Sequence, residues 1–270
     1  LLAIVTGLVI VGGIARIAHF TQTVVPLMVA IYVGASLWII LLHITALPHA
    51  FGLIFTEAFA PSAVAGGIVG VIVQGFQRAA FSSEAGLGSA PIAHSPARVK
   101  YPVQQGLVAL YEPFIDTVII CTMTALVIIL TGVYDPANGY ATLIESKQGA
   151  ALTAVAYGLV ISWFPIILSI SIFLFAFSTL IAWFYYGERA WVYLFGTKSS
   201  VWFKVFFLSF IVLASVVSTD IMVDFSSMLF LFMALPNILG LFILSGDVKR
   251  YLDEYIQKLK SGELDKEVLD

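Results

Sequence analysis

Residues 79–95, AAFSSEAGLGSAPIAHS, place polar side chains and glycines between two long apolar runs. Ser82, Ser83 and Glu84 come first, and Gly86 begins a set of two glycines and a proline. Glycine and proline weaken a helix, and backbone groups that leave a helix cannot stay unpaired in hydrocarbon. The stretch therefore predicts a break that lines a cavity, where helix ends and unwound backbone can bind a small charged solute and a cation. A short cytoplasmic loop is the alternative interpretation.

The composition around this stretch is that of an integral membrane protein. Hydrophobic residues make up 60% of the chain and charged residues 11%, with a mean hydropathy of +1.02. In soluble domains about a quarter of the residues are charged. A net charge of −3 gives no basis for a nucleic-acid partner, and the single cysteine can form no internal disulfide.

Seven apolar runs can be cut at the length that a membrane helix needs, and the first of them is short because the sequence starts within it. The runs are residues 1–11, 24–42, 63–81, 103–130, 154–185, 201–217 and 221–244. We expect an all-α, polytopic membrane protein with a transmembrane core over residues 1–246 and a cytoplasmic amphipathic tail over residues 247–270. The first residues contain neither a methionine nor a charged region, so we expect the C-terminal part of a longer protein.

The distribution of basic residues predicts the orientation. If the loop after the first run is cytoplasmic, all of the 13 lysines and arginines except Arg78 and Lys147 fall on the cytoplasmic side. The C terminus is then cytoplasmic, and the expected location is the cell membrane. A half-length apolar helix around Phe51 to Phe59 falls in an exterior connection.

The run GFQRAAFSSEAGLGSAPIAHSPARVKYPVQQGLVALYEPFIDTVIICTMTAL, residues 75–126, resembles the alanine or glycine:cation symporter family. Members of that family share a SNEAGxGSAPIAH signature, followed by QG and by a helix containing DT and CTxTAL. Ser83 replaces the asparagine of the signature. The upstream VVPLMVAIYVGASL and AFAPSAVAGG look like the same family, so the resemblance covers essentially the whole membrane part.

The resemblance implies a LeuT-like fold of two inverted five-helix repeats. The first two apolar runs would be core helices four and five, the third run with the break would be a discontinuous helix six, and the last four runs would be helices seven to ten. It also implies sodium-coupled symport of a small neutral amino acid, alanine or glycine, by alternating access across the plasma membrane. Na⁺ would be the coupling ion, the lipid bilayer the surrounding partner, and no catalysis is implied. The oligomeric state stays open, a monomer included.

Two other classes of function compete with symport. A passive channel, or another cation-coupled solute transporter, is the alternative. A channel would need a continuous polar stripe along several helices, whereas the polar residues of this sequence cluster at the breaks. An intramembrane enzyme is disfavoured because the four histidines lack an HExxH spacing and no serine lies in GxSxG.

By the same resemblance, the Phe175 carbonyl and the hydroxyls of Ser178 and Thr179 would bind sodium. Their spacing of i, i+3 and i+4 puts these oxygens on one helix face, although serine and threonine also commonly bond back to their own helix. Trp183, one turn further, is either a wall of the substrate pocket or an interfacial tryptophan. The predicted substrate site comprises Phe81, Ser82, Ser83, Glu84, Gly86, Thr179 and Trp183.

Four further ionisable residues lie in the apolar runs, where charge is costly and usually faces a pathway or a partner. Glu112 and Asp116 are one helical turn apart, and we expect them to support the cation path, with a structural role as the alternative. Arg78 and Asp224 would form an outer gate or, alternatively, a static pair.

Overall fold

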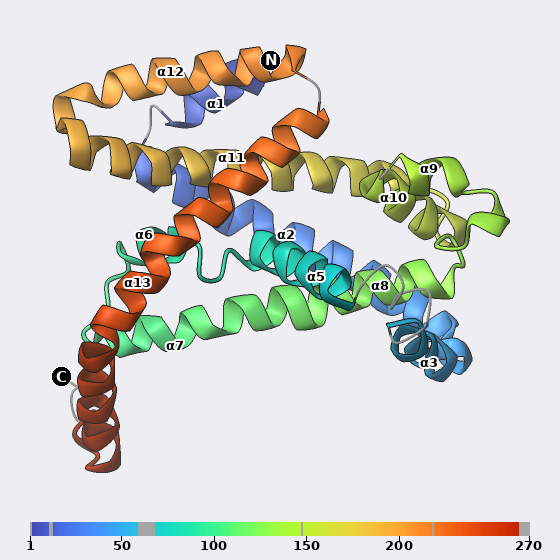
Figure 1. The fold of residues 1–270 in the computed structure, drawn as a ribbon, viewed down its shortest axis with the longest axis horizontal. Helices are drawn as coiled ribbons and strands as arrows, with labels where there is room; N and C mark the ends of the chain where they lie inside the picture. Colours follow the sequence, from blue (N-terminus) through green and yellow to red (C-terminus); the bar gives the residue numbers. More distant parts are fainter. Residues whose placement is uncertain (1, 11–12, 59–67, 147, 218, 265–270) are drawn as a thin grey trace. The chain divides into compact units, whose positions relative to one another are not determined.

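The computed structural model describes residues 2–10, 13–58, 68–146, 148–217 and 219–264. Within these ranges the chain forms helices and turns with no strand, which confirms the predicted all-helical class (Figure 1). The chain divides into two compact units. Unit 1 contains residues 1–75 and 117–215, and unit 2 contains residues 76–116 and 216–270.

Four helical stretches in the described ranges are long and apolar enough to cross a bilayer, as expected for a polytopic membrane protein. They are Thr21–Leu42, Pro102–Leu130, Phe164–Phe195 and Ile221–Lys260. Some residues of the predicted segments lie outside the described residues, namely Leu1 and Val11 of the first run, Phe59 of the half-length helix, residues 63–67 of the third run and residues 265–270 of the predicted tail. Lys147, the basic residue that opposes the predicted orientation, also lies outside them.

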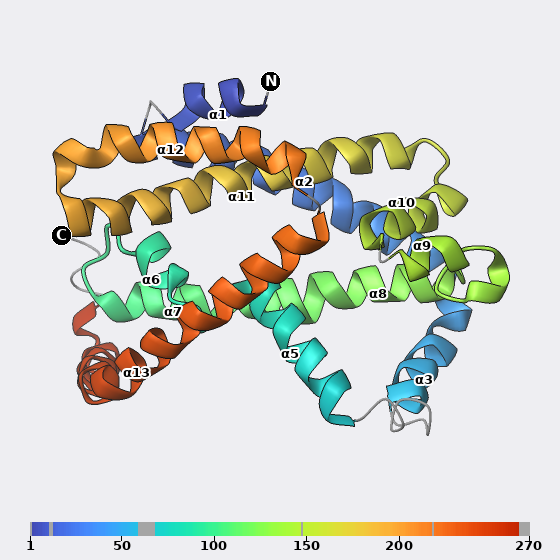
Figure 2. The same ribbon diagram turned by 45° about the horizontal axis from the view of Figure 1, so that its top comes forward.

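Unit 1 is built on the long helix α11. Its helices are α1 (Leu2–Ile10), α2 (Gly13–Leu42), α3 (Leu47–Ala58), α8 (Cys121–Leu130), α9 (Ala141–Glu145), α10 (Gly149–Val160), α11 (Phe164–Phe195) and α12 (Ser200–Leu213). Helix α11 packs against α2, α10 and α12, and α2 also packs against α8. Helices α11 and α12 lie side by side and antiparallel (Figure 2). Helix α3 coincides in position with the half-length apolar helix predicted around Phe51 to Phe59.

The core of unit 1 lies where α2, α8 and α10 meet. Ile39, Val127 and Tyr157 are fully buried there. The Tyr157 hydroxyl shares a hydrogen bond of 2.6 Å with Ser36 Oγ, so that both buried hydroxyls have a partner. This packing holds the start of α11 against α2.

The prediction of one continuous helix over residues 154–185 is wrong, because α10 ends at Val160 and α11 begins at Phe164. Pro165 has no N–H with which to bond the Ile161 carbonyl, which weakens the helix at this point. The chain turns back tightly here: a Cβ added to Gly158 would lie 2.8 Å from Pro165 Cγ. Two packed helices therefore replace the predicted single one.

Unit 2 consists of the last turns of α5 (Ile68–Ser83), α6 (Ser89–His94), α7 (Pro102–Pro113) and α13 (Thr219–Lys260). Helices α6 and α13 both pack against α7. Beyond α7 the chain continues as a π-helical segment, Phe114–Ile120, before α8. Helix α13 runs without interruption through residue 246, so the predicted division into core and tail coincides with no helix end and stays a prediction.

Candidate functional site

The stretch between α5 and α6 is not helical. Helix α5 ends at Ser83, α6 begins at Ser89, and the backbone between them adopts left-handed conformations. The φ angle is 80° at Gly86 and 96° at Gly88, which glycine accepts without steric cost. Glu84, with φ 54°, is the one non-glycine residue with a positive φ in the described part of the chain. Such a conformation costs about 1 to 2 kcal/mol in an L-residue, so surrounding contacts must hold it.

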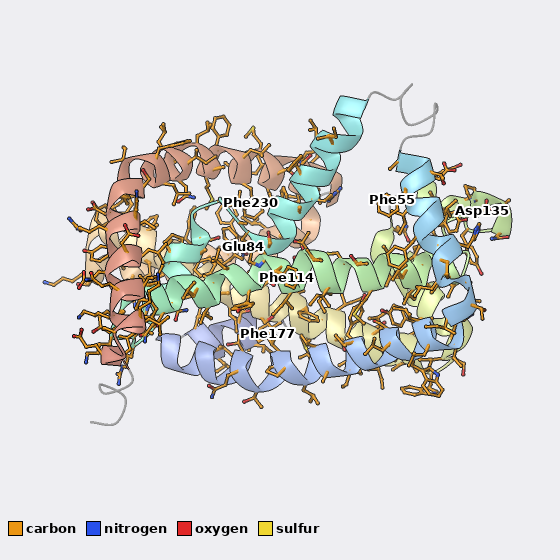
Figure 3. All side chains as sticks on the ribbon, turned by 90° about the horizontal axis from the view of Figure 1, so that it is seen from below. Phe55, Glu84, Phe114, Asp135, Phe177 and Phe230 are labelled. Carbon is orange, nitrogen blue, oxygen red and sulfur yellow. The ribbon has the colours of Figure 1, made fainter. Side chains whose placement is uncertain are left out.

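The Glu84 side chain makes one of the contacts that hold this backbone conformation. The hydroxyl of Ser89, a fully buried residue, donates to Glu84 Oε2 at 2.6 Å. Figure 3 labels Glu84 at this turn. The bond joins the residue that follows α5 to the first residue of α6, so the Glu84 carboxylate braces the non-helical stretch from one side to the other.

The two serines at the end of α5 have different partners. Ser82 Oγ donates to Asp116 Oδ2 at 2.5 Å, which links α5 to the π-helical segment after α7. Ser83 Oγ donates back to the Ala79 carbonyl at 2.9 Å and accepts a longer bond, 3.4 Å, from the Ala85 N–H. The structure therefore brings Ser82 and Asp116 together and directs the Ser83 hydroxyl to its own backbone.

Glu112 and Asp116, predicted to act near each other, bind different neighbours. Glu112 Oε2 lies 3.3 Å from His94 Nε2, and the side-chain amide of Gln105 lies 2.6 Å from the other ring nitrogen of His94. His94 ends α6 and Gln105 lies on α7, so this polar group connects the two helices.

The shift to π-helical geometry at Phe114 follows Pro113, whose missing N–H interrupts the α-helical bonding pattern.

Arg78 and Asp224 are both exposed, and in the described ranges no ion pair joins them. The predicted outer gate stays a prediction. A group of three or more histidine, cysteine and acidic side chains able to hold a metal ion is likewise not found among the described residues.

The residues predicted to bind sodium lie on α11 in unit 1. Ser178 is 7% exposed, and its hydroxyl donates to the Phe175 carbonyl at 2.8 Å. The Thr179 side chain is exposed. Trp183 packs edge-on against Tyr186, with 5.5 Å between the ring centroids. All the other predicted site residues belong to unit 2.

Sequence reasoning missed Asn237 on α13. Its side-chain amide donates to the Gly86 carbonyl at 2.9 Å, so α13 contacts the non-helical stretch directly. The signal was present: an amide at membrane depth usually has a specific partner, and here it follows a proline within an apolar helix. His94 and Gln105 were also passed over.

The chain resembles known transporters over its whole length. The model of the sodium:alanine symporter family matches residues 1–269. An uncharacterized transporter of Haemophilus influenzae is 36% identical over 99% of this chain and 58% of its own length. The sodium/alanine symporter AgcS of Methanococcus maripaludis is 38% identical over 92% of this chain and 54% of its own length. The probable sodium/glutamine symporter GlnT of Bacillus subtilis is 33% identical over 97% of this chain and 54% of its own length. The chain thus spans little more than half of these relatives.

Proposed function

Because the chain belongs to the sodium:alanine symporter family, we propose that it functions in sodium-coupled symport of a small neutral amino acid, alanine or glycine, by alternating access across the plasma membrane. Family membership and its apolar helices make it a multi-pass membrane protein. The observation that carries the proposal furthest is the non-helical stretch between Ser83 and Ser89 in an otherwise apolar, helical chain.

We place amino-acid binding at this stretch. The last turn of α5 has backbone carbonyls without helical partners, and the negative end of the helix dipole lies there, so a substrate ammonium group would be stabilised. Ser82 and Gly86 are exposed at this point and would contact the substrate, whereas Glu84 and Ser83 would support the backbone, given the bonds they already make. This interpretation treats α5 and α6 as two halves of the discontinuous sixth core helix of a LeuT-like fold.

Sodium would bind on α11. The carbonyl of Phe175 and the hydroxyls of Ser178 and Thr179 are neutral, hard oxygen donors of the kind that suits Na⁺. The bond from Ser178 to the Phe175 carbonyl uses the hydroxyl hydrogen and leaves the oxygen lone pairs of Ser178 for a cation. The donor set therefore fits the ion. Asp116 and Glu112 would add negative charge near the cation path.

The pocket wall would be aromatic. Trp183 and Phe81 are the proposed walls, and the Phe81 ring makes an edge-on contact with Phe230, with 4.7 Å between the ring centroids. Rigid rings would admit a hydrogen or methyl side chain and exclude branched ones. Since one relative carries the name of a glutamine symporter, side-chain size is the property to measure first.

The proposed orientation keeps the C terminus in the cytoplasm, with residues 1–246 in the transporter core and 247–270 as the tail. The gate formed by Arg78 and Asp224 also belongs to this proposal. In a conformation with a closed exterior path the two side chains would approach each other.

Uptake into proteoliposomes tests the function. The full-length protein would be reconstituted, and labelled alanine uptake measured with an inward sodium gradient and with potassium in its place. We expect accumulation above the external concentration only with the sodium gradient. Equilibration without accumulation would favour a passive channel, and accumulation driven equally by another cation would favour a different coupling ion. Competition by unlabelled glycine, valine, leucine and glutamine would define the substrate size.

A further inference from the structure

One face of α13 is covered along the middle of the helix. The partly buried positions there are Ser226, Ser227, Phe230, Met233, Ala234, Asn237 and Gly240, while the positions between them are exposed. Spacings of three and four residues place these side chains on one side of the helix. Helix α13 therefore has a defined packing face within unit 2, and Asn237 is the strongest hydrogen-bonding group on it.

This face makes two contacts, one with the end of α5 and one with the non-helical stretch that follows it. Phe230 packs edge-on against Phe81 in the last turn of α5. Two helical turns further on, Asn237 donates to the Gly86 carbonyl at 2.9 Å. A Cβ added to Gly88 would lie 3.3 Å from Asn237 Cβ, so the absence of a side chain at Gly88 allows the close approach of Asn237.

The bond from Asn237 gives a hydrogen-bond donor to a carbonyl that the left-handed turn leaves without a helical partner. The backbone at Gly86 has left the helix, so its carbonyl has no helical N–H to accept from. An asparagine amide supplies this carbonyl with a neutral donor and adds no charge beside the exposed turn. The direction of the Gly86 carbonyl is thereby tied to the position of α13.

We propose that Asn237 is a positioning residue for the substrate site: its amide holds the Gly86 carbonyl and so sets the shape of the backbone between α5 and α6. The inference rests on the proposed function, because it places the substrate at this backbone. Asn237 acts through Gly86 and does not itself contact the substrate. Its loss should therefore weaken substrate binding more than it slows turnover.

Three substitutions separate the hydrogen bond from the shape of the side chain. Asn237→Asp keeps the shape but places an acceptor opposite a carbonyl, Asn237→Ala removes the group, and Asn237→Gln keeps an amide donor. Leu239→Ala, at a position 64% exposed on the other side of α13, is the matched control. In sodium-driven alanine uptake by the full-length protein, we expect KM to rise about tenfold for the Asp and Ala variants, as for a lost hydrogen bond that leaves its acceptor unpaired. The Gln variant should be affected less, and kcat should change little.

A second measurement reports the backbone without transport. Ala85 is exposed, so Ala85→Cys can be labelled with a membrane-impermeant thiol reagent after Cys121, the single cysteine of this chain, and any cysteine in the rest of the full-length protein have been replaced by serine. We expect Asn237→Asp to raise the labelling rate several-fold. Alanine should protect the introduced cysteine when Asn237 is intact, and should protect it poorly when the Asn237→Asp substitution has removed the amide donor.

The outcomes are distinguishable. If the Asp and Ala variants keep the wild-type KM and labelling rate, Asn237 positions nothing and the proposal is overturned. If no variant, wild type included, shows sodium-driven uptake, the proposed function fails, and a changed labelling rate would still establish the contact between Asn237 and the turn. If the Asp or Ala variant does not insert into the membrane, Asn237→Leu replaces it, because leucine has a similar volume and no hydrogen-bond donor, and the same changes in KM and labelling rate are expected.

Discussion

Ser89 donates its hydroxyl hydrogen to Glu84 Oε2 at 2.6 Å, and this bond spans a turn in which the residue that accepts it has a left-handed backbone. A glutamate between two apolar stretches could serve as a charge for the substrate or as a support for the chain. The buried Ser89 favours support, because its hydroxyl has no exposure to water and the carboxylate is its partner.

Substitutions at Glu84 separate charge from support. Glu84→Gln removes the charge but keeps an oxygen that accepts from Ser89, so we expect sodium-driven alanine uptake within about threefold of wild type. Glu84→Ala removes the acceptor and leaves a buried hydroxyl unpaired, at a cost of about 1 to 3 kcal/mol, and should lower uptake at least tenfold. Uptake rates at equal protein density check this. Equal loss in both variants would show that the charge itself is needed.

Gly86→Val should abolish uptake with little loss of protein in the membrane. A Cβ at this position would meet no atom within 4 Å, so the effect would come from the backbone, where φ is 80°, and from volume added beside the substrate. A β-branched residue is strongly disfavoured at positive φ, whereas asparagine tolerates it. Gly86→Asn is the control: it should fold as well as wild type in a thermal aggregation assay. Full uptake by the Val variant would remove Gly86 from the site.

Thr179→Ala should weaken sodium activation of transport. The substitution deletes one of three proposed oxygen ligands and leaves the α11 backbone intact, so the sodium concentration for half-maximal uptake should rise about tenfold, with little change in alanine KM at saturating sodium. Thr179→Ser retains the hydroxyl and should behave as wild type. Ser169→Ala, whose exposed hydroxyl bonds its own helix at the Pro165 carbonyl, is a control for α11. An unchanged sodium dependence in Thr179→Ala would show that the assignment is wrong.

Trp183→Ala should broaden the range of substrates. Removing the ring would open space for larger side chains and remove contacts to alanine, so valine and leucine should compete with labelled alanine more strongly while alanine itself binds less tightly. Trp202→Ala, at a tryptophan that is 72% exposed, controls for general effects of losing an indole. An unchanged size limit would leave Trp183 as an interfacial anchor.

The sequence alone was sufficient for the helical class, the membrane location and the place where α5 ends. These depend on local properties: apolar composition over about twenty residues predicts a membrane helix, and Gly86, Gly88 and the polar residues before them predict the break. The signature around this break also indicated the family that the comparison over residues 1–269 establishes.

The turn at Ile161 shows where local reasoning reached its limit. Residues 154–185 read as one apolar span because apolar composition does not distinguish one long helix from two packed ones. Pro165 was a local signal for the turn, but a proline in a membrane helix is also compatible with a kink. The close approach of Gly158 to Pro165 depends on how α10 packs against α11, and only the folded chain has that contact.

Hydrogen-bond partners were the least predictable feature of the candidate site. Asn237 and Gly86 are 151 residues apart in sequence, and Ser82 and Asp116 are 34 apart. Side-chain hydrogen bonds are short and directional, so a partner is determined by which helix faces meet and by the rotation of each helix about its axis. Spacing along one helix predicts a shared face, but it holds no information about the residue that packs opposite to that face.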